Sequence, residues 1–126
     1  MKHAAIAAVL LAAELVFCLL SAAAVCGTMR ETEDLLALSR VQAGNGDFAG
    51  AGSSVRAAEE VWNENAGLYG VVLSHADTDE VLRGFAALEQ LAGLGERKDF
   101  LTRSAELLVS IGQLRKMQLP LLRNIL

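Results

Sequence analysis

An apolar run near the amino terminus constrains this chain more than any other feature. From Ala4 to Cys26 the sequence has 23 residues and a single charge, Glu14. At about 1.5 Å per residue, a helix of that length measures about 35 Å and can cross a hydrocarbon core of about 30 Å. We therefore expect residues 1–27 to form a transmembrane anchor or a signal segment, and residues 28–126 to form one separate domain.

Two fates are open for this segment. The strong apolar residues favour insertion, and the central Glu14 opposes it by about 2.5 to 3.5 kcal/mol if glutamate resembles aspartate, so insertion is favourable but marginal. Lys2 supplies a positive amino end, and Ala22-Ala23-Ala24 offers a small-residue cleavage site, as in a secretory signal peptide. The apolar run is longer than a usual signal-peptide core, which favours a retained anchor.

The charges around the segment predict its orientation. Lys2 precedes the apolar run, whereas Arg30 behind it is followed closely by Glu31, Glu33 and Asp34. Loops rich in Lys and Arg stay preferentially in the cytoplasm. We expect a single-pass protein of the cell membrane with its amino terminus in the cytoplasm and its C-terminal domain outside. If the segment is cleaved, the domain is secreted.

Helical periodicity continues directly after the apolar run. Residues 28–43 carry an apolar stripe at helical spacing, and the left-handed preference of Gly44-Asn45-Gly46 favours a stop. Only Gly27 separates the stripe from the apolar run, so one continuous helix is a further possibility. The inward residues expected on this stripe are Met29, Leu35, Leu38 and Val41.

A seven-residue period predicts the next helix, with Asp47 as its N-cap. Large residues recur at the spacing that keeps one face of a helix apolar, with smaller residues between them. We expect one long helix to about Ser74, although a break near Gly67 is open, because glycine weakens a helix by about 1 kcal/mol relative to alanine. The recurring large residues are Phe48, Val55, Trp62 and Tyr69.

Two further helices complete the expected fold. Asp77 and Glu80 fit a capping box for a helix that stops at Gly93 to Gly95. A last helix is expected from about Arg97 to Gln118, ended by Pro120. The inward residues expected are Val81, Phe85, Leu88 and Leu91 or Ala92 in the first helix, and Phe100, Leu107, Ile111 and Leu114 in the second. The predicted class is all-α: a single N-terminal transmembrane helix followed by a small antiparallel bundle of about four helices.

Composition argues against several functions. A net charge of −4 argues against a nucleic-acid partner. Two cysteines build neither a four-cysteine zinc site nor a disulfide framework, and the glycines lie singly instead of in a phosphate-binding loop. No serine is singled out beside a base by its spacing, as nucleophilic catalysis requires. We therefore expect no enzymatic activity, no cofactor and no bound metal.

Three single residues are candidates for interaction. Glu14 either contacts another transmembrane helix inside the bilayer or is a carboxyl that is protonated in lipid or lost with a signal peptide. Trp62 is either an anchor of the core or a binding platform. His75 lies near Asp77 and Asp79 and could bind metal or transfer a proton. We expect it instead to close the long helix near its carboxyl end, where the helix dipole favours positive charge.

The tail of the chain is a further candidate surface. Residues 119–126 are apolar except for Arg123 and Asn124. If exposed, such a segment would mark an interaction site. Alternatively, it folds across the open end of the bundle and buries Leu122, Ile125 and Leu126.

Short motifs along nearly the whole chain resemble a known family. They are the amino-terminal apolar segment, Asn45-Gly46-Asp47-Phe48, Trp62, the junction from His75 to Glu80, and the closing residues 122–126. Together they resemble short, singly anchored bacterial proteins catalogued as domain of unknown function 4363. This chain carries Ala and Gly where such proteins usually carry Glu and Lys. The resemblance implies a retained anchor and an extracytoplasmic position in Gram-positive, often spore-forming bacteria, and it brings no established activity.

Two classes of function remain. The first is a non-catalytic, membrane-anchored helical adaptor that binds another membrane or envelope protein; the anchor, Glu14 and the apolar tail point to it. The alternative is an exported ligand-binding or enzymatic helical domain that uses His75 and nearby carboxylates. The bilayer itself is a partner in the first class.

Overall fold

The computed structural model describes the backbone of residues 1–125 and the side chains of residues 1–118. These residues form helices joined by short turns and contain no strand, so the predicted all-α class is confirmed. The elements are α1 (Lys2–Gly44), α2 (Phe48–Glu64), α3 (Ala66–Val72), α4 (His75–Leu94) and α5 (Arg97–Ile125).

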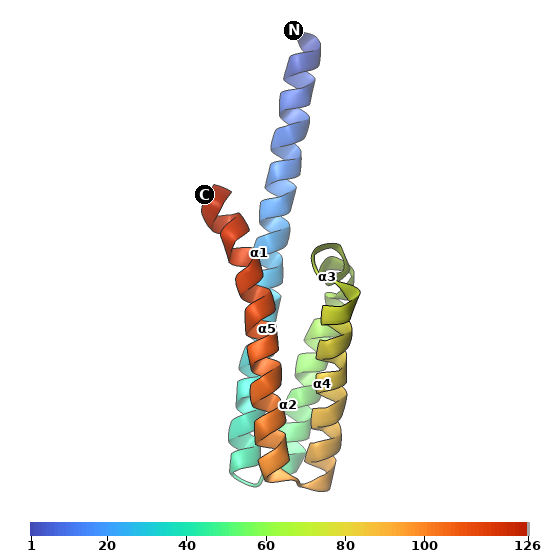
Figure 1. The fold of residues 1–126 in the computed structure, drawn as a ribbon, viewed down its shortest axis with the longest axis vertical. Helices are drawn as coiled ribbons and strands as arrows, with labels where there is room; N and C mark the ends of the chain where they lie inside the picture. The colour runs from blue at the N-terminus through green and yellow to red at the C-terminus, as the bar shows by residue number, and fades with distance from the viewer. Residues whose placement is uncertain (126) are drawn as a thin grey trace.

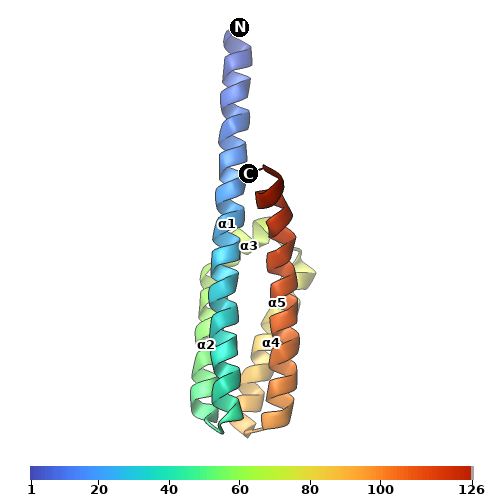
Figure 2. The same ribbon diagram turned by 90° about the vertical axis from the view of Figure 1, so that its left-hand side faces the viewer.

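The second half of α1 forms an antiparallel bundle with α2, α4 and α5 (Figure 1). Helix α1 packs against α2 and α5, and α4 packs against the same two helices, so α1 and α4 occupy opposite corners of the bundle. The first half of α1 projects beyond the bundle in both views (Figures 1 and 2). The chain therefore has a long apolar first helix followed by a helical bundle, as predicted, and Gly27 does not interrupt α1.

The buried seam of α1 differs from the predicted stripe. Its members are separated alternately by three and four residues, the spacing of a helix that packs along a coiled-coil seam, and they are Ala22, Val25, Met29, Thr32, Leu36, Ser39 and Ala43. Leu38 and Val41 are exposed, so their predicted burial is wrong. The sequence misled because the seam uses small and polar residues. Thr32 and Ser39 can be buried since their hydroxyls donate to the carbonyls of Thr28 and Leu36 on their own helix.

The turn between α1 and α2 matches the prediction. Gly46 has a φ of +82°, a left-handed angle that glycine adopts without steric cost. Asp47 is the N-cap of α2, and its side chain accepts a hydrogen bond of 2.9 Å from the backbone N–H of Gly50.

The expected long helix over residues 48–74 is broken, so that prediction is wrong. Helix α2 ends at Glu64, and α3 is a separate short helix. At the break, the Asn65 side-chain amide donates to the carbonyl of Val61, which satisfies one of the free carbonyl groups at the end of α2. The helix therefore breaks at Asn65, two residues before Gly67, near which the sequence analysis had allowed a break as the alternative.

The start of α4 also corrects a prediction. Ser74, and not Asp77, is the N-cap, because the Ser74 hydroxyl accepts a hydrogen bond from the backbone N–H of Asp77. The predicted capping box of Asp77 and Glu80 is wrong, since both residues lie inside α4.

Helices α4 and α5 bury the faces that their periodicity predicts. In α4 these residues are Val81, Phe85, Leu88 and Ala92, and in α5 they are Phe100, Leu107, Ile111 and Leu114. Gly84 lets the helices approach closely, because a Cβ atom there would meet the side chain of Leu107. Gly95, with a φ of +68°, ends α4 as expected.

Pro120 does not end the last helix, contrary to the prediction. The backbone of α5 remains helical to Ile125, and the helix bends near its carboxyl end in Figure 1. Proline removes one N–H and crowds the preceding turn, which kinks a helix without always terminating it.

Candidate functional site

The projecting half of α1 is the most unusual surface of the molecule. Its large apolar side chains are exposed on every side of the helix and are Ile6, Val9, Leu10, Leu11, Leu15, Val16, Phe17 and Leu20. The most apolar window of α1 has a mean hydropathy of 2.5, and 11% of it is buried. A helix that is apolar all round needs an apolar environment, either a protein interior or a membrane. Helix α1 is therefore a candidate membrane span or signal anchor.

The length of the projecting half matches a bilayer. Between Lys2 and Leu20 every residue except half-buried Leu19 is exposed, and Ala22 is the first residue buried in the bundle. These 19 residues measure about 28 Å as a helix, against about 30 Å for a hydrocarbon core. The end of the bundle thus lies immediately beside the end of the candidate span.

Glu14 lies within the projecting half and is exposed. No hydrogen bond or ion pair joins it to another side chain among residues 1–118. Ala4, Ala8 and Ala12 are exposed on the same part of α1. The contact of Glu14 with a second transmembrane helix stays a prediction.

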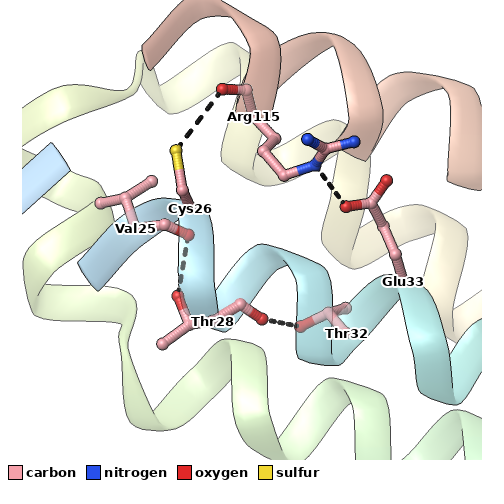
Figure 3. A network of polar contacts seen from close by, with 6 residues as sticks. All are labelled: Val25, Cys26, Thr28, Thr32, Glu33 and Arg115. Atoms are coloured by element: carbon pink, nitrogen blue, oxygen red, sulfur yellow. Dashed lines mark hydrogen bonds and ion pairs between the residues drawn. The ribbon is translucent and has the colours of Figure 1, made fainter. Parts of the chain in front are cut away.

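Polar contacts hold α5 against α1 just below the projecting half (Figure 3). The Cys26 thiol donates to the carbonyl of Arg115 over 3.8 Å, and the Arg115 Nε donates to Glu33 Oε2 over 2.7 Å. Both partners of the ion pair are largely buried. On α1 itself, Thr28 donates to the carbonyl of Val25. These contacts join α5 to the first turns of the bundled half of α1.

A buried tyrosine ties α3 to the same level of α1. The hydroxyls of Tyr69 and Thr28 share a hydrogen bond of 2.5 Å. Burial raises the pKa of the Tyr69 phenol above its ordinary value, while the hydrogen bond to Thr28 lowers it. The phenol therefore stays neutral at physiological pH and serves as a structural link between α3 and α1.

Trp62 belongs to the core. Its ring lies 4.4 Å from the ring of Tyr69 and 6.3 Å from that of Phe85, between centroids. The side chain is buried and reachable by no partner on the surface. Its alternative role as a binding platform does not fit this position; the aromatic cluster instead joins α2, α3 and α4.

His75 lies in a different place from the one predicted. It is the first residue of α4 and is exposed, so it does not cap the carboxyl end of a long helix. The reason is that the helix ends after α2, and that the backbone of Leu73 and Ser74 is extended between α3 and α4. At the amino end of a helix the dipole disfavours a positive charge, which removes the physical basis for that capping role.

The carboxylates near His75 do not form a site with it. Asp77 and Glu80 line a small hollow of about 150 Å³ between α4 and α5, and His75 is not among its lining residues. Sites for small molecules usually measure about 300 to 1,000 Å³. Among residues 1–118, no group of three His, Cys, Asp or Glu side chains is arranged to hold a metal ion.

The candidate residues of the tail follow Gln118, the last residue whose side chain is described. The side chains of Leu122 and Ile125, and the whole of Leu126, lie outside the described residues. The backbone of α5 up to Ile125 extends past the level of α3, beside the projecting half of α1 (Figures 1 and 2).

Comparison with known proteins adds no relative. No family model matches the chain, and neither a curated protein nor a solved structure matches it. The resemblance to domain of unknown function 4363 therefore stays a prediction.

Proposed function

We propose that this protein is a membrane-anchored helical adaptor. Its α1 crosses a bilayer once with the amino terminus in the cytoplasm, and its bundle lies on the extracytoplasmic side, where it binds another membrane or envelope protein. One observation carries the proposal: a bilayer-length, all-round apolar half of α1 stands outside the bundle and continues into it without a linker. Such a surface is unfavourable in water and favourable in lipid.

Fractionation tests the anchor. A chain with a tag at each terminus should stay in the membrane fraction after carbonate washing, and both tags should be found on one polypeptide. Loss of the amino-terminal tag with release of the domain would show a cleaved signal peptide instead. Recovery of the two-tag chain in the soluble cell contents would contradict both membrane routes.

Cysteine labelling tests the orientation. In a chain with Cys18→Ser and Cys26→Ser, a cysteine at Leu94, which is exposed on the bundle, should react in intact cells with a membrane-impermeant maleimide. A cysteine at Lys2 should react only after the membrane is permeabilised. The reverse pattern would overturn the proposed orientation.

Crosslinking in native membranes, followed by mass spectrometry, tests the adaptor role. We expect one dominant protein partner. A chimera in which an unrelated transmembrane segment replaces residues 2–20 separates two modes of binding. It keeps the partner if the bundle binds it, and loses the partner if Glu14 and the span bind it. Recovery of no partner with the parent chain would count against the adaptor.

The alternative function predicts a different result at one residue. If the domain uses His75 for catalysis or ligand binding, His75→Ala should abolish the biological phenotype without changing the thermal melt. An adaptor should tolerate the change, because His75 is exposed. We also propose membership of the family of domain of unknown function 4363, on the motifs named above.

A further inference from the structure

The two ends of the bundle differ in surface chemistry. At the end away from the projecting half lie the α1–α2 and α4–α5 turns (Figure 1). Their exposed charged residues are Asp47, Glu96, Arg97, Lys98 and Asp99. At the other end lies α3, and residues 66–73 contain no charged side chain. The turns at one end of the bundle are therefore charged, whereas α3 at the other end carries no charge.

The end of the bundle that carries α3 also exposes apolar surface. Val71 in α3 is 76% exposed, and Met117 in α5 lies exposed at the same end of the bundle. Among the described residues that follow Ala22, no large apolar side chain is more exposed than Val71. A valine projecting from a charge-free segment is unfavourable in water and favourable in an apolar or interfacial environment.

The position of α3 along α1 places this end beside the candidate span. Tyr69 is bonded to Thr28, which follows the apolar run ending at Cys26 by two residues, about 3 Å along the helix axis. Because α1 is one unbroken helix, the bundle cannot move away from the bilayer on a flexible linker. If α1 spans the membrane, α3 lies at the level of the headgroups.

We propose that α3 is a membrane-seating element. Residues 66–73, led by Val71, enter the interfacial region of the bilayer that α1 spans, so that the bundle stands directly on the phospholipid surface. The proposal rests on the proposed function, because it requires α1 to be the span. Continuity with α1 selects lipid as the occupant over a second protein, because the bond of Tyr69 to Thr28 holds α3 beside the end of the span.

Charges on the neighbouring helices limit how deeply the bundle enters. Exposed Glu64 at the end of α2 and half-buried Asp77 in the first turn of α4 flank α3. Carboxylates are repelled by anionic lipid and favoured by water. Seating should therefore involve apolar side chains such as Val71 at the tip of α3, and it should not be strengthened by phosphatidylglycerol.

Site-directed fluorescence tests the proposal in the full chain. In the Cys18→Ser, Cys26→Ser background, single cysteines at Leu10, Val71 and Leu94 are labelled with nitrobenzoxadiazole and reconstituted in phosphatidylcholine vesicles. Leu94 is the matched control, since it is 64% exposed and lies at the opposite end of the bundle. We expect blue-shifted emission at position 71 with quenching by a headgroup-level spin-labelled lipid, water-like emission at 94, and quenching by a deep spin label at 10.

Each other outcome is decisive. Water-like emission at position 71, with position 10 quenched, overturns the seating and leaves the anchor intact. Blue-shifted emission at 71 without lipid quenching shows that protein covers α3, which also overturns it. An unquenched probe at position 10 overturns the anchor itself. Emission at 71 that shifts only when phosphatidylglycerol is added contradicts the apolar mode of contact.

Discussion

The two halves of α1 form one unbroken helix but differ in how hydrophobicity relates to burial. Before Ala22 the helix exposes large apolar residues all round, whereas after Ala22 it buries a narrow seam that includes Thr32 and Ser39. Hydrophobicity is therefore highest where burial inside the protein is lowest. The difference teaches that burial in this chain cannot be judged from hydrophobicity alone, because the apolar residues of a candidate membrane span need no place in the protein core.

The largest expected effect comes from a charge in the projecting half. Leu15→Arg should disfavour insertion by about 3 to 4 kcal/mol, because arginine near the helix centre costs about 2.5 to 3.5 kcal/mol and a favourable leucine is lost. Since insertion is already marginal, the chain should leave the membrane fraction.

A matched control lies on the same helix. Leu15 is 45% exposed and Leu38 is 47% exposed, so Leu38→Arg makes the same chemical change at similar exposure in the bundled half. It should leave fractionation unchanged. Equal behaviour of the two variants would show that the halves do not differ in environment.

The next largest effect should come from the seam. Leu36→Ala removes a fully buried side chain of α1, and such truncations cost about 2 to 5 kcal/mol through lost burial and a residual cavity. Thermal or urea unfolding in detergent micelles measures it. Leu38→Ala, two residues away and exposed, should change the unfolding free energy by less than about 0.5 kcal/mol. A similar loss of unfolding free energy in both variants would show that the buried seam is assigned to the wrong residues.

An intermediate effect should come from the ion pair of Glu33 and Arg115. A double-mutant cycle with Glu33→Gln and Arg115→Gln should give a coupling free energy of about 1 to 2 kcal/mol, since the pair is largely buried and joins α1 to α5. The exposed pair of Arg103 and Glu106 within α5 is the control, with an expected coupling below about 0.5 kcal/mol. Coupling no larger than in the control would mean that Glu33 does not hold α5.

The smallest expected effect concerns a carboxyl of the bundle. Burial and then the Glu89 carboxylate raise the pKa of Glu59 above its ordinary value of 4.5. In the pH range from 4.5 up to the raised pKa, the folded state binds more protons than the unfolded state, so this residue makes stability fall as pH rises.

Glu59→Gln should remove that fall and stabilise the fold above this range. Glu60→Gln is the control, because it removes the same charge from an exposed position beside it. Thermal melts at several pH values measure both variants. A parent chain that gains stability relative to Glu59→Gln as the pH rises through the range would contradict the sign.

Much of the fold could be predicted because several helices follow simple periodicity. The inward faces of α4 and α5 were predicted correctly, since Val81, Phe85 and Leu88, like Phe100, Leu107 and Ile111, recur at spacings that return to one face of a helix. The seam of α1 could not be found in this way. Leu35, Leu38 and Val41 are more apolar than Thr32, Ser39 and Ala43, yet the latter three are the fully buried ones, because burial on α1 follows the face that meets α2 and α5.

Two candidate residues show what sequence patterns along a single helix could not predict. His75 was expected at the end of one helix and starts another, because α2 ends at Glu64 and the extended backbone of Leu73 and Ser74 separates α3 from α4. Trp62 was open between core and surface, and its contacts with Tyr69 and Phe85 decide for the core. Such contacts join residues on different helices, so no local pattern reports them.

Composition and periodicity alone were enough to establish an all-helical chain with a bilayer-length apolar segment at its amino end, because both depend on the order of residues along a single helix. The three-dimensional packing was needed to show that this segment enters the bundle without a linker and that α3 lies at its level. Those facts depend on which helices meet and at what height, through contacts such as those of Thr28 with Tyr69 and of Glu33 with Arg115. Residues far apart in the sequence make these contacts, and only the folded chain brings them together.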